Sequence, residues 1–456
     1  MQSRKSQEPG KKTGRKAGNK SSAKTGAKDV DGGSPIGAGD GDGTGSDPAA
    51  AAETTAARSA DTDGQSDVGA SPEAAAAIPP DTAAAVAPDA AAEDRPLALA
   101  SPLASIAHES NRMVWRGQSG HYEVWFLTVH NPATRTSYWL RYTLESPDPA
   151  HGSPYVELWF SRCDAADPRR NFGIHRRYPL SSFESAQSPF LLRIAESELG
   201  HAHASGSLAG NRHEVSWDLQ WEPAPRLHQL LPSSLYADRL GIAETLLLSP
   251  NHSVEVRGSI QIDGERIELT HARAGQSHIW GRKHAYGWGW GRCNSFEFAD
   301  DLALSTPASA VLETLSVRMR GGPVVIPLTV VSVYPEGLDG AELAFKSWLT
   351  MPVCRADFRT GSYTVSAHGL TRKVEVQYTC RADDMVRTEY VDPDGSPAYC
   401  HFAGAASCRL TLSRRAVPGA AWKPFRTFRT ERGAQFEWAG RAGDSQVKHR
   451  HLRLED

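Results

Sequence analysis

Hydrophobic and polar residues alternate along much of the chain after residue 100, and this period of two predicts β-strands. Arg212–Trp221 (RHEVSWDLQW) is a clear case, because its odd-numbered positions are His or large apolar residues and its even-numbered positions are polar or charged. Other β-branched and aromatic runs lie between Asn-Pro, Pro-Asp-Pro and Gly breaks. The predicted strands are 121–130, 138–145, 155–162, 212–221, 253–262, 265–270, 315–319, 324–334, 363–367, 373–380, 385–391, 408–413 and 447–454.

Helical periodicity is scarce beside these strands. One short helix is predicted at 343–349 and a turn of another within 232–243. Asp263-Gly264 joins two predicted strands as a tight hairpin turn. Many short strands with Gly and Pro turns are typical of sandwiches and barrels. We therefore predict an all-β fold of two consecutive antiparallel β-barrel domains, residues 101–277 and residues 278–456.

Residues 1–100 have a different composition from the rest of the chain. They contain no Trp, Tyr, Phe or Cys and consist mainly of Ala, Gly, Ser, Asp, Pro and Lys. Such a segment has too little apolar surface to form a core, so we expect a disordered, low-complexity tail. Residues 1–28 carry nine basic side chains and one acidic, and residues 29–95 carry fourteen acidic and two basic.

Charge narrows the classes of partner. The tail sums to −4 and the whole chain to −3, which leaves the body near +1. A near-neutral body argues against nucleic acid as the main partner. The basic stretch either binds an anionic surface or is solvated; we favour solvation, because no aromatic residues accompany its lysines. We expect at most peripheral membrane contact.

The N-terminal segment and the cysteines indicate the cellular compartment. No apolar stretch of signal-peptide type follows the N-terminal basic residues, and the longest apolar run, Pro323–Tyr334, is too short to span a bilayer. The six cysteines show no CxxC or other close metal spacing. We read them as reduced thiols and expect a cytoplasmic protein.

The run His278–Phe298 (HIWGRKHAYGWGWGRCNSFEF) lies at the junction of the two predicted domains. In an extended chain its even-numbered side chains share one face. They are His278, Trp280, Arg282, His284, Tyr286, Trp288, Trp290, Arg292, Asn294, Phe296 and Phe298. Four glycines between Gly281 and Gly291 leave the other face nearly bare, which suggests close approach of another segment. A turn near Ala285–Gly287 is the alternative, and it would switch the faces.

Each aromatic ring of this run, taken singly, is also explained as a core residue. The whole row is not, because two His, two Arg and one Asn lie among the rings, and buried polar groups need partners. We therefore interpret the row as the wall of a ligand cavity. Arg282 and Arg292 have two readings, as salt-bridge donors or as anchors for a ligand carboxylate or phosphate.

Several segments together resemble the tocopherol cyclase and carotenoid 1,2-hydratase-like group, proteins of two consecutive lipocalin-like barrels. They are EVWFLTVHNP, YWLRYTL, VELWFSR, VSWDLQW, VRGSIQIDGERIEL and, most specifically, His278-x-Trp280-Gly281 with Trp288-x-Trp290-x-x-Cys293-Asn294-Ser-Phe296. The resemblance covers most of residues 115–300. It implies an aromatic-lined cavity for a large apolar ligand. Members of the group cyclise prenylated aromatics, hydrate terminal prenyl double bonds, or have no known reaction.

Protonating an isolated alkene requires an acid kept neutral by apolar surroundings and ring faces that stabilise the carbocation. His278 and His284 are candidate proton donors or partners of an acid. Of the carboxyls, Glu297 lies nearest but on the opposite parity, and Glu123 lies in an early strand; we rank Asp218 and Glu157 first. For each of these two, the ordinary explanation is a surface carboxylate on a strand with a polar outer face, and we favour it over the catalytic one. The expected ligand-binding residues are Trp280, Arg282, Tyr286, Trp288, Trp290, Asn294 and Phe296.

The function hypothesis is a cofactor-independent cyclase or hydratase acting on an isoprenoid, prenyl-aromatic or carotenoid-like substrate. The alternative is a carrier that holds an apolar ligand and does no chemistry. A carboxyl buried within hydrogen-bonding reach of the cavity separates the two, because only the enzyme needs one.

Other chemistries have less support. His271, His278, His284 and Cys293 match no short zinc-ligand spacing, so no metal site is expected. Gly-x-Ser-x-Gly and the phosphate-loop and dinucleotide fingerprints do not occur, so neither serine hydrolysis nor a nucleotide cofactor is expected. His449 and His451 alternate with basic residues and are interpreted as part of an exposed strand.

Overall fold

The structure, a computed structural model, describes residues 109–236, 243–299, 309–321 and 324–454. These residues belong to one compact unit, and the predicted tail, residues 1–100, lies outside them. The described part is mainly β-structure, with α-helical turns at residues 109–111 and in the four-residue α2 (Ser233–Tyr236). This confirms the predicted all-β fold class. None of the helices in the described ranges has the length and hydropathy needed to cross a membrane.

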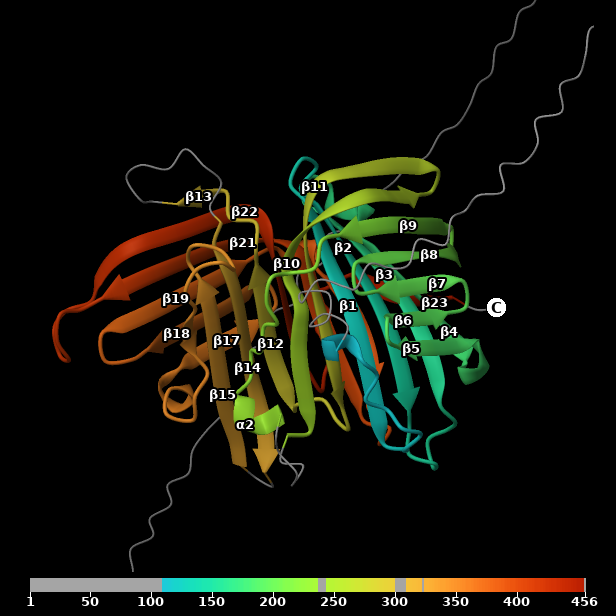
Figure 1. The fold of residues 1–456 in the computed structure, drawn as a ribbon, viewed down its shortest axis with the longest axis horizontal. Helices are drawn as coiled ribbons and strands as arrows, with labels where there is room; N and C mark the ends of the chain where they lie inside the picture. Colours follow the sequence, from blue (N-terminus) through green and yellow to red (C-terminus); the bar gives the residue numbers. More distant parts are fainter. Residues whose placement is uncertain (1–108, 237–242, 300–308, 322–323, 455–456) are drawn as a thin grey trace, which may run out of the picture. The chain divides into compact units, whose positions relative to one another are not determined.

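The first set of strands pairs in the order β4, β3, β2, β1, β11, β10, β9, β8, β7, β6, β5, and every pairing is antiparallel (Figure 1). Their bounds are β1 His121–Asn131, β2 Thr136–Ser146, β3 Tyr155–Asp164, β4 Phe172–Pro179, β5 Phe183–Gln187, β6 Phe190–Ile194, β7 Ser197–Gly200, β8 His203–Gly210, β9 His213–Trp221, β10 Thr245–Ile262 and β11 Glu265–Gly281.

The second set pairs in the order β16, β15, β14, β12, β22, β21, β19, β18, β17, with β13 beside β22 and β20 beside β21. Their bounds are β12 Gly287–Cys293, β13 Phe298–Ala299, β14 Val311–Gly321, β15 Val324–Tyr334, β16 Leu343–Phe345, β17 Arg355–Arg359, β18 Ser362–His368, β19 Arg372–Thr379, β20 Val386–Val391, β21 Pro397–Arg414 and β22 Lys423–Gly440. Short 3₁₀ turns occur at Pro168–Arg170 (η1), Leu180–Ser182 (η2), Met351–Val353 (η3) and Ala382–Asp384 (η4).

One further strand, β23 (His449–Leu454), connects the two sets. It pairs in parallel with β4 of the first set and with β20 of the second. His451 of this strand packs against the indoles of Trp159 and Trp139. The interpretation of the His449–His451 region as merely exposed is therefore wrong for His451, because the strand lies between the two sets.

Two local predictions concern helices. A turn within 232–243 is confirmed by α2. The helix predicted at 343–349 is wrong: Leu343–Phe345 form β16, which pairs with Val331–Val333 of β15. The pairing satisfies backbone groups that a seven-residue isolated helix would leave largely unpaired, and it outweighs the weak local periodicity.

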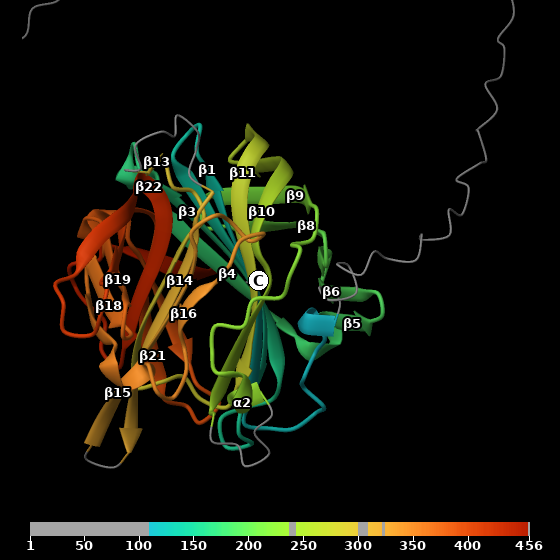
Figure 2. The ribbon, with the colours of Figure 1, turned by 60° about the vertical axis from the view of Figure 1, so that its left-hand side comes forward.

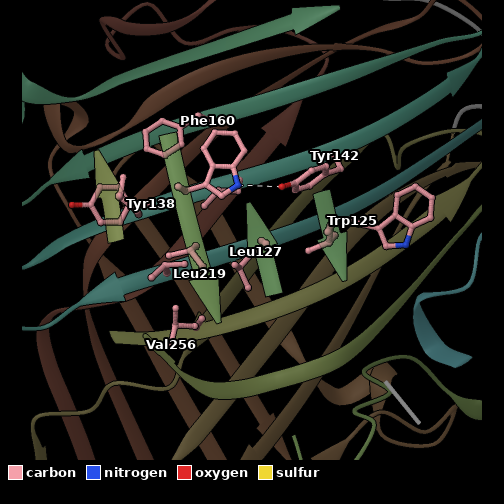
Figure 3. Packing of buried hydrophobic residues seen from close by; sticks show 14 of the residues in the cluster. Trp125, Leu127, Tyr138, Tyr142, Phe160, Leu219 and Val256 are labelled. Atoms are coloured by element: carbon pink, nitrogen blue, oxygen red, sulfur yellow. Dashed lines mark hydrogen bonds between the residues drawn. The ribbon is translucent and has the colours of Figure 1, made fainter. Parts of the chain in front are cut away.

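The described residues form four buried hydrophobic clusters, of which the smallest contains Leu230, Leu247, Val330 and Met351. One fills the first set and contains Trp125, Leu127 and Tyr142; the Tyr142 hydroxyl accepts a hydrogen bond from the Trp217 indole (Figure 3). A second fills the second set around Tyr363 and Tyr378. A third lies between the two sets and draws residues from both. The candidate site adjoins this third cluster.

Candidate functional site

A cavity of about 750 Å³ lies between the two sets of strands. Its wall is mostly aromatic and aliphatic, and each set contributes part of it. The rings that line it are Tyr122, Phe126, Trp139, Tyr286, Trp288, Trp290, Trp348, Tyr390 and Phe402. A volume of this size falls in the range that holds one drug-sized or isoprenoid-sized molecule. The cavity predicted from the sequence is therefore present, between the strand sets.

The alternation of side chains along β1 determines which of its residues face the cavity. Tyr122, Val124 and Phe126 line the cavity, whereas Trp125 and Leu127 point into the core of the first set. Both faces of this strand are thus buried, one against a core and one against the cavity.

The β12 strand presents its indoles to the cavity because glycines occupy its other face. Trp288 and Trp290 line the cavity. A Cβ built on Gly289 would lie 2.9 Å from the Phe358 ring, and one on Gly291 would lie 2.5 Å from the Tyr378 ring. The prediction that glycines permit close approach on one side is confirmed. Only residues without side chains let the second core pack this closely behind the indoles.

Two carboxyls line the cavity among the described residues, Glu244, which is exposed, and Glu437, which lies deeper. Glu437 lies on β22 directly opposite Trp290 on β12 and opposite Phe402 on β21. Its Oε1 accepts a hydrogen bond of 2.7 Å from the Trp288 indole, and its Oε2 accepts one of 3.3 Å from the Cys400 thiol. Burial raises the pKa of Glu437 above its usual value, although these two donors and the nearby Arg141 charge act in the opposite direction.

Arg141 of β2 brings a positive charge to the same wall. Its guanidinium carbon lies 4.2 Å from the Tyr390 ring centroid and 5.2 Å from that of Trp159. Its Nε donates a 3.0 Å hydrogen bond to the Thr143 hydroxyl. Within the described ranges it forms no ion pair with a carboxylate. A desolvated guanidinium on aromatic faces is suited to hold the polar end of a ligand.

His284 forms a second polar group of the wall. Its Nδ1 donates a 2.6 Å hydrogen bond to Asp392, and Arg441 donates one of 2.7 Å to the other oxygen of the same carboxylate. The imidazole stacks on Tyr122, at 4.4 Å between centroids. Burial alone would raise the pKa of Asp392, but the bonds from His284 and Arg441 lower it. The ionised Asp392 therefore orients His284 and leaves Nε2 as the nitrogen that can exchange a proton with a ligand.

A fully buried polar cluster supports the wall behind Trp290. The carboxylate of Glu313 accepts hydrogen bonds from the Trp290 indole at 2.8 Å and from Arg292 at 3.0 Å. Its other oxygen lies 3.3 Å from Nε2 of His228 and 3.1 Å from Nδ1 of His252. The attraction of Arg292 and the histidines outweighs burial and holds the pKa of Glu313 well below its usual value.

His228, His252 and Glu313 also have the composition of a metal-binding triad, and their ligand atoms lie within 4.8 Å of one another. Arg292 already neutralises the carboxylate in this fully buried site. A divalent cation there would leave two uncompensated positive charges buried, so we assign the cluster to positioning Trp290 and not to metal binding.

The predicted single row from His278 to Phe298 is interrupted, because β11 ends at Gly281 and β12 begins at Gly287. The turn that the sequence allowed as an alternative lies between them. Four of the predicted site residues meet at the cavity: His284, Tyr286, Trp288 and Trp290.

The other predicted catalytic residues lie away from the cavity lining. His278 faces the first core, where its ring nitrogens lie 2.9 Å from the Ser110 carbonyl oxygen and 2.8 Å from Glu123. Burial would raise the pKa of Glu123, but bonds from His121 and His278 lower it to about 2, which keeps the group ionised. Asp218 lies on the exposed face of β9. Glu157 is buried against Arg177 at 2.9 Å, and burial raises its pKa.

The remaining predicted ligand-binding residues are also elsewhere. Asn294 donates a hydrogen bond to the Ala274 carbonyl oxygen, and Phe296 packs on Phe428 in the second core. Trp280 packs on His278, and Arg282 is exposed after the end of β11. None of these four belongs to the cavity lining.

Glu437, Arg141 and Asp392 were missed by the sequence reasoning. Glu437 stands in a Phe-Glu-Trp alternation within β22, a strand that was not predicted. Arg141 was inside a predicted strand but looked like an ordinary polar-face residue. Asp392 follows β20 in a Val-Asp-Pro-Asp-Gly turn and carries no sequence signal of its contact with His284, which is 108 residues away.

Comparisons with known proteins place the chain only broadly. No family model matches it. The uncharacterized proteins Rv0493c and MT0513 of two Mycobacterium tuberculosis strains are each 24% identical to it over 314 residues, 66% of this chain and 84% of the relative.

Two solved structures resemble it in fold. The AttH-like protein NE1406 of Nitrosomonas europaea matches with a TM-score of 0.43 and 13% identity, over 71% of this chain and 93% of that one. CghA, in a crystal structure with Sch210972, matches with a TM-score of 0.44 and 8% identity, over 71% and 89%. A likeness this remote concerns the fold alone. The predicted kinship with the tocopherol cyclase and carotenoid hydratase group stays a prediction.

Proposed function

We propose that the chain is a cofactor-independent enzyme that protonates an alkene of a large apolar substrate and lets the carbocation cyclise or take up water. The proposed substrate class is isoprenoid, prenyl-aromatic or carotenoid-like. The observation that carries the proposal is the position of Glu437 on the wall of an apolar cavity. Burial there raises the pKa of its carboxyl group. A carboxylic acid kept neutral at working pH is what such a protonation requires.

The first step transfers the proton of the Glu437 carboxyl to the less substituted alkene carbon. A C–H bond forms, the π bond breaks, and a tertiary cation remains in the cavity. Donors from Trp288 and Cys400 then stabilise the carboxylate that is left behind. The faces of Trp288, Trp290 and the other wall rings stabilise the cation through their quadrupoles.

The second step forms a C–O bond when a hydroxyl of the substrate, or water, attacks the cation. The oxygen loses its proton to Nε2 of His284, and Asp392 stabilises the resulting imidazolium through the Nδ1 hydrogen bond. Return of that proton through solvent to Glu437 restores the starting state. Arg141, near the same carboxylate, is suited to bind the polar end of the substrate.

A carrier remains the second candidate, because the apolar lining and the ring faces serve binding equally well. The two functions differ in one respect. A carrier returns its ligand with unchanged bonds, whereas the enzyme adds a solvent-derived proton to carbon.

We therefore expect conversion in D₂O to place one deuterium on carbon. The probes are a geranylgeranyl-substituted hydroquinone, an acyclic carotenoid and any molecule that co-purifies with the chain, each followed by mass spectrometry. Glu437→Gln, which has no acidic proton, should lower conversion at least ~100-fold, the usual size of a general-acid contribution, while quenching of tryptophan fluorescence by the probe stays near wild type. Glu389→Gln, which changes an exposed carboxylate that pairs with Arg387 and does not line the cavity, is the matched control.

The pH dependence follows from the direction of the Glu437 shift. Because its pKa is raised, the reactive acid form persists above the ordinary value of 4.5 and disappears as pH rises through the raised pKa. Conversion should decline along this alkaline limb. If all three probes bind, none is converted by the wild type and the co-purified molecule is returned unlabelled, the carrier function replaces the enzyme.

A further inference from the structure

The hairpin formed by β14 and β15 ends in an exposed apolar tip. On most strands of this fold at least one face is buried, but here Val324, Val325 and Ile326 are exposed on consecutive positions and so on both faces. Met319, which pairs with Ile326 across the hairpin, is exposed as well. Figure 2 shows this end of the hairpin at the lower edge of the second strand set. Exposed apolar side chains grouped in this way mark interaction sites in soluble proteins.

A neighbouring loop adds two more large apolar side chains. Trp348 is 52% exposed and Leu349 is 89% exposed. The Trp348 indole donates a 3.0 Å hydrogen bond to Ser234 of α2, and Figures 1 and 2 both place α2 at the same lower end as the hairpin tip. We call these six residues, Met319, Val324, Val325, Ile326, Trp348 and Leu349, the apolar rim.

The apolar rim is continuous with the cavity. Met319 and Trp348 are exposed and also line the cavity, together with Leu328 and Val317 further along the hairpin. Arg320 also lines the cavity at this end, so a ligand that enters between these side chains would pass from the apolar rim to the wall rings beside one guanidinium group. The apolar rim and the cavity wall therefore share side chains at this end of the second strand set.

The charge of the hairpin tip indicates which kind of surface it binds. Arg318 and Arg320 flank Met319, and the described tip residues 318–320 and 324–327 include no acidic side chain. Exposed apolar side chains, a rim tryptophan and adjacent arginines together match a bilayer with anionic headgroups, because the arginines bind phosphates while the apolar groups enter the acyl region.

A second copy of the chain fits this tip less well. Six residues are few beside the 20–30 per partner of a stable interface. Pairing through the outer edge of β15 is also hindered, because Pro327 lies on the stretch that precedes its pairing with β16 at Val331–Val333.

We propose that the apolar rim docks the protein on an anionic lipid surface, from which the apolar ligand enters the cavity. Docking needs only the rim and its arginines; the entry of a substrate by this route rests on the function proposed above.

The test is flotation of the full chain with vesicles of phosphatidylcholine and phosphatidylglycerol, compared with phosphatidylcholine alone. Wild type should bind the mixed vesicles more tightly. Val325→Asp with Ile326→Asp should weaken binding more than ~10-fold, since each apolar side chain contributes several-fold when buried. Arg318→Gln and Arg320→Gln should each weaken it about fivefold.

The matched control is Leu370→Asp with Val417→Asp, two exposed apolar residues that are not cavity-lining, and it should bind like wild type. Circular dichroism confirms folding of each variant. Wild type that binds neither vesicle, or a rim variant that binds as well as wild type, overturns the docking. A wild-type dimer that the rim variant dissociates, without vesicle binding, would show instead that the rim joins two copies.

The Glu437→Gln variant should float like wild type, which separates the two proposals. Flotation without conversion of any probe removes the catalytic function and leaves docking intact. Conversion of a detergent-dispersed probe without flotation removes the docking proposal and leaves the catalytic function intact.

Discussion

Gly289 and Gly291 show how two missing side chains position the indoles of Trp288 and Trp290. The Phe358 and Tyr378 rings occupy the space that a Cβ would need. The β12 backbone therefore lies directly on the second core, and its large side chains have only the cavity side available.

We predict that Gly291→Ala destabilises the protein by about 1–3 kcal/mol, the usual effect of overpacking a dense core. The added methyl would lie 2.5 Å from the Tyr378 ring, which is fully buried and has little room to shift. Urea unfolding measures the change. Gly369→Ala is the control, since its nearest neighbour would be 3.7 Å away; equal losses in the two variants would contradict the account.

At the scale of the elements, a buried charge cluster connects strands of both sets. Glu313 of β14 and Arg292 of β12 belong to the second set, and His252 of β10 belongs to the first. Their side chains are fully buried, so each charge depends on the others. The cluster fixes the back of the Trp290 wall and the relative position of these strands.

We predict that Glu313→Gln lowers the free energy of unfolding by about 3–5 kcal/mol, because the Arg292 charge is left buried without a partner. Glu375→Gln, which removes an exposed partner of Lys373, should cost less than about 1 kcal/mol. Thermal and urea unfolding compare the two. A loss at Glu313 no larger than at Glu375 would mean that water or a rearrangement compensates Arg292.

The same cluster gives stability a pH dependence. Burial lowers the pKa of His252 to about 3 from an ordinary 6.5. Between these two pH values the unfolded chain binds a proton at His252 and the folded chain does not. This contribution is complete above pH 6.5 and is lost as pH falls from there towards 3, which adds to the acid sensitivity of the wild type.

On the scale of the whole molecule, β23 is a strand that pairs with both strand sets. It follows β22 in the chain and pairs with β4 of the first set and β20 of the second. Leu454 at its end is buried in the first core. The cavity lies between the same two sets, so their relative position determines its shape.

We predict that a chain ending at Gln446 is less stable by more than the ~2–5 kcal/mol expected for truncating Leu454 alone, and that its two strand sets unfold in separate transitions. A chain ending at Leu454 is the control. Calorimetry distinguishes one transition from two, and a single unshifted transition in the shorter chain would rule out this role for β23.

The sequence by itself determined what depends on local periodicity. Alternation in Arg212–Trp221 and the Asp263-Gly264 turn are properties of neighbouring residues, so the all-β fold, most strands and the aromatic wall at Trp288 and Trp290 were predictable. The glycines that alternate with those indoles also predicted that another segment packs closely against the opposite face of the strand.

Only the tertiary structure decided which polar groups meet. Glu437 reaches Trp288 from 149 residues away, and Asp392 reaches His284 from 108 residues away. The turn after Gly281 sent His278 to the first core and His284 to the cavity. Contacts at such separations arise from strand pairing and packing between the two sets, and no local pattern encodes which carboxyl will be buried on the cavity wall.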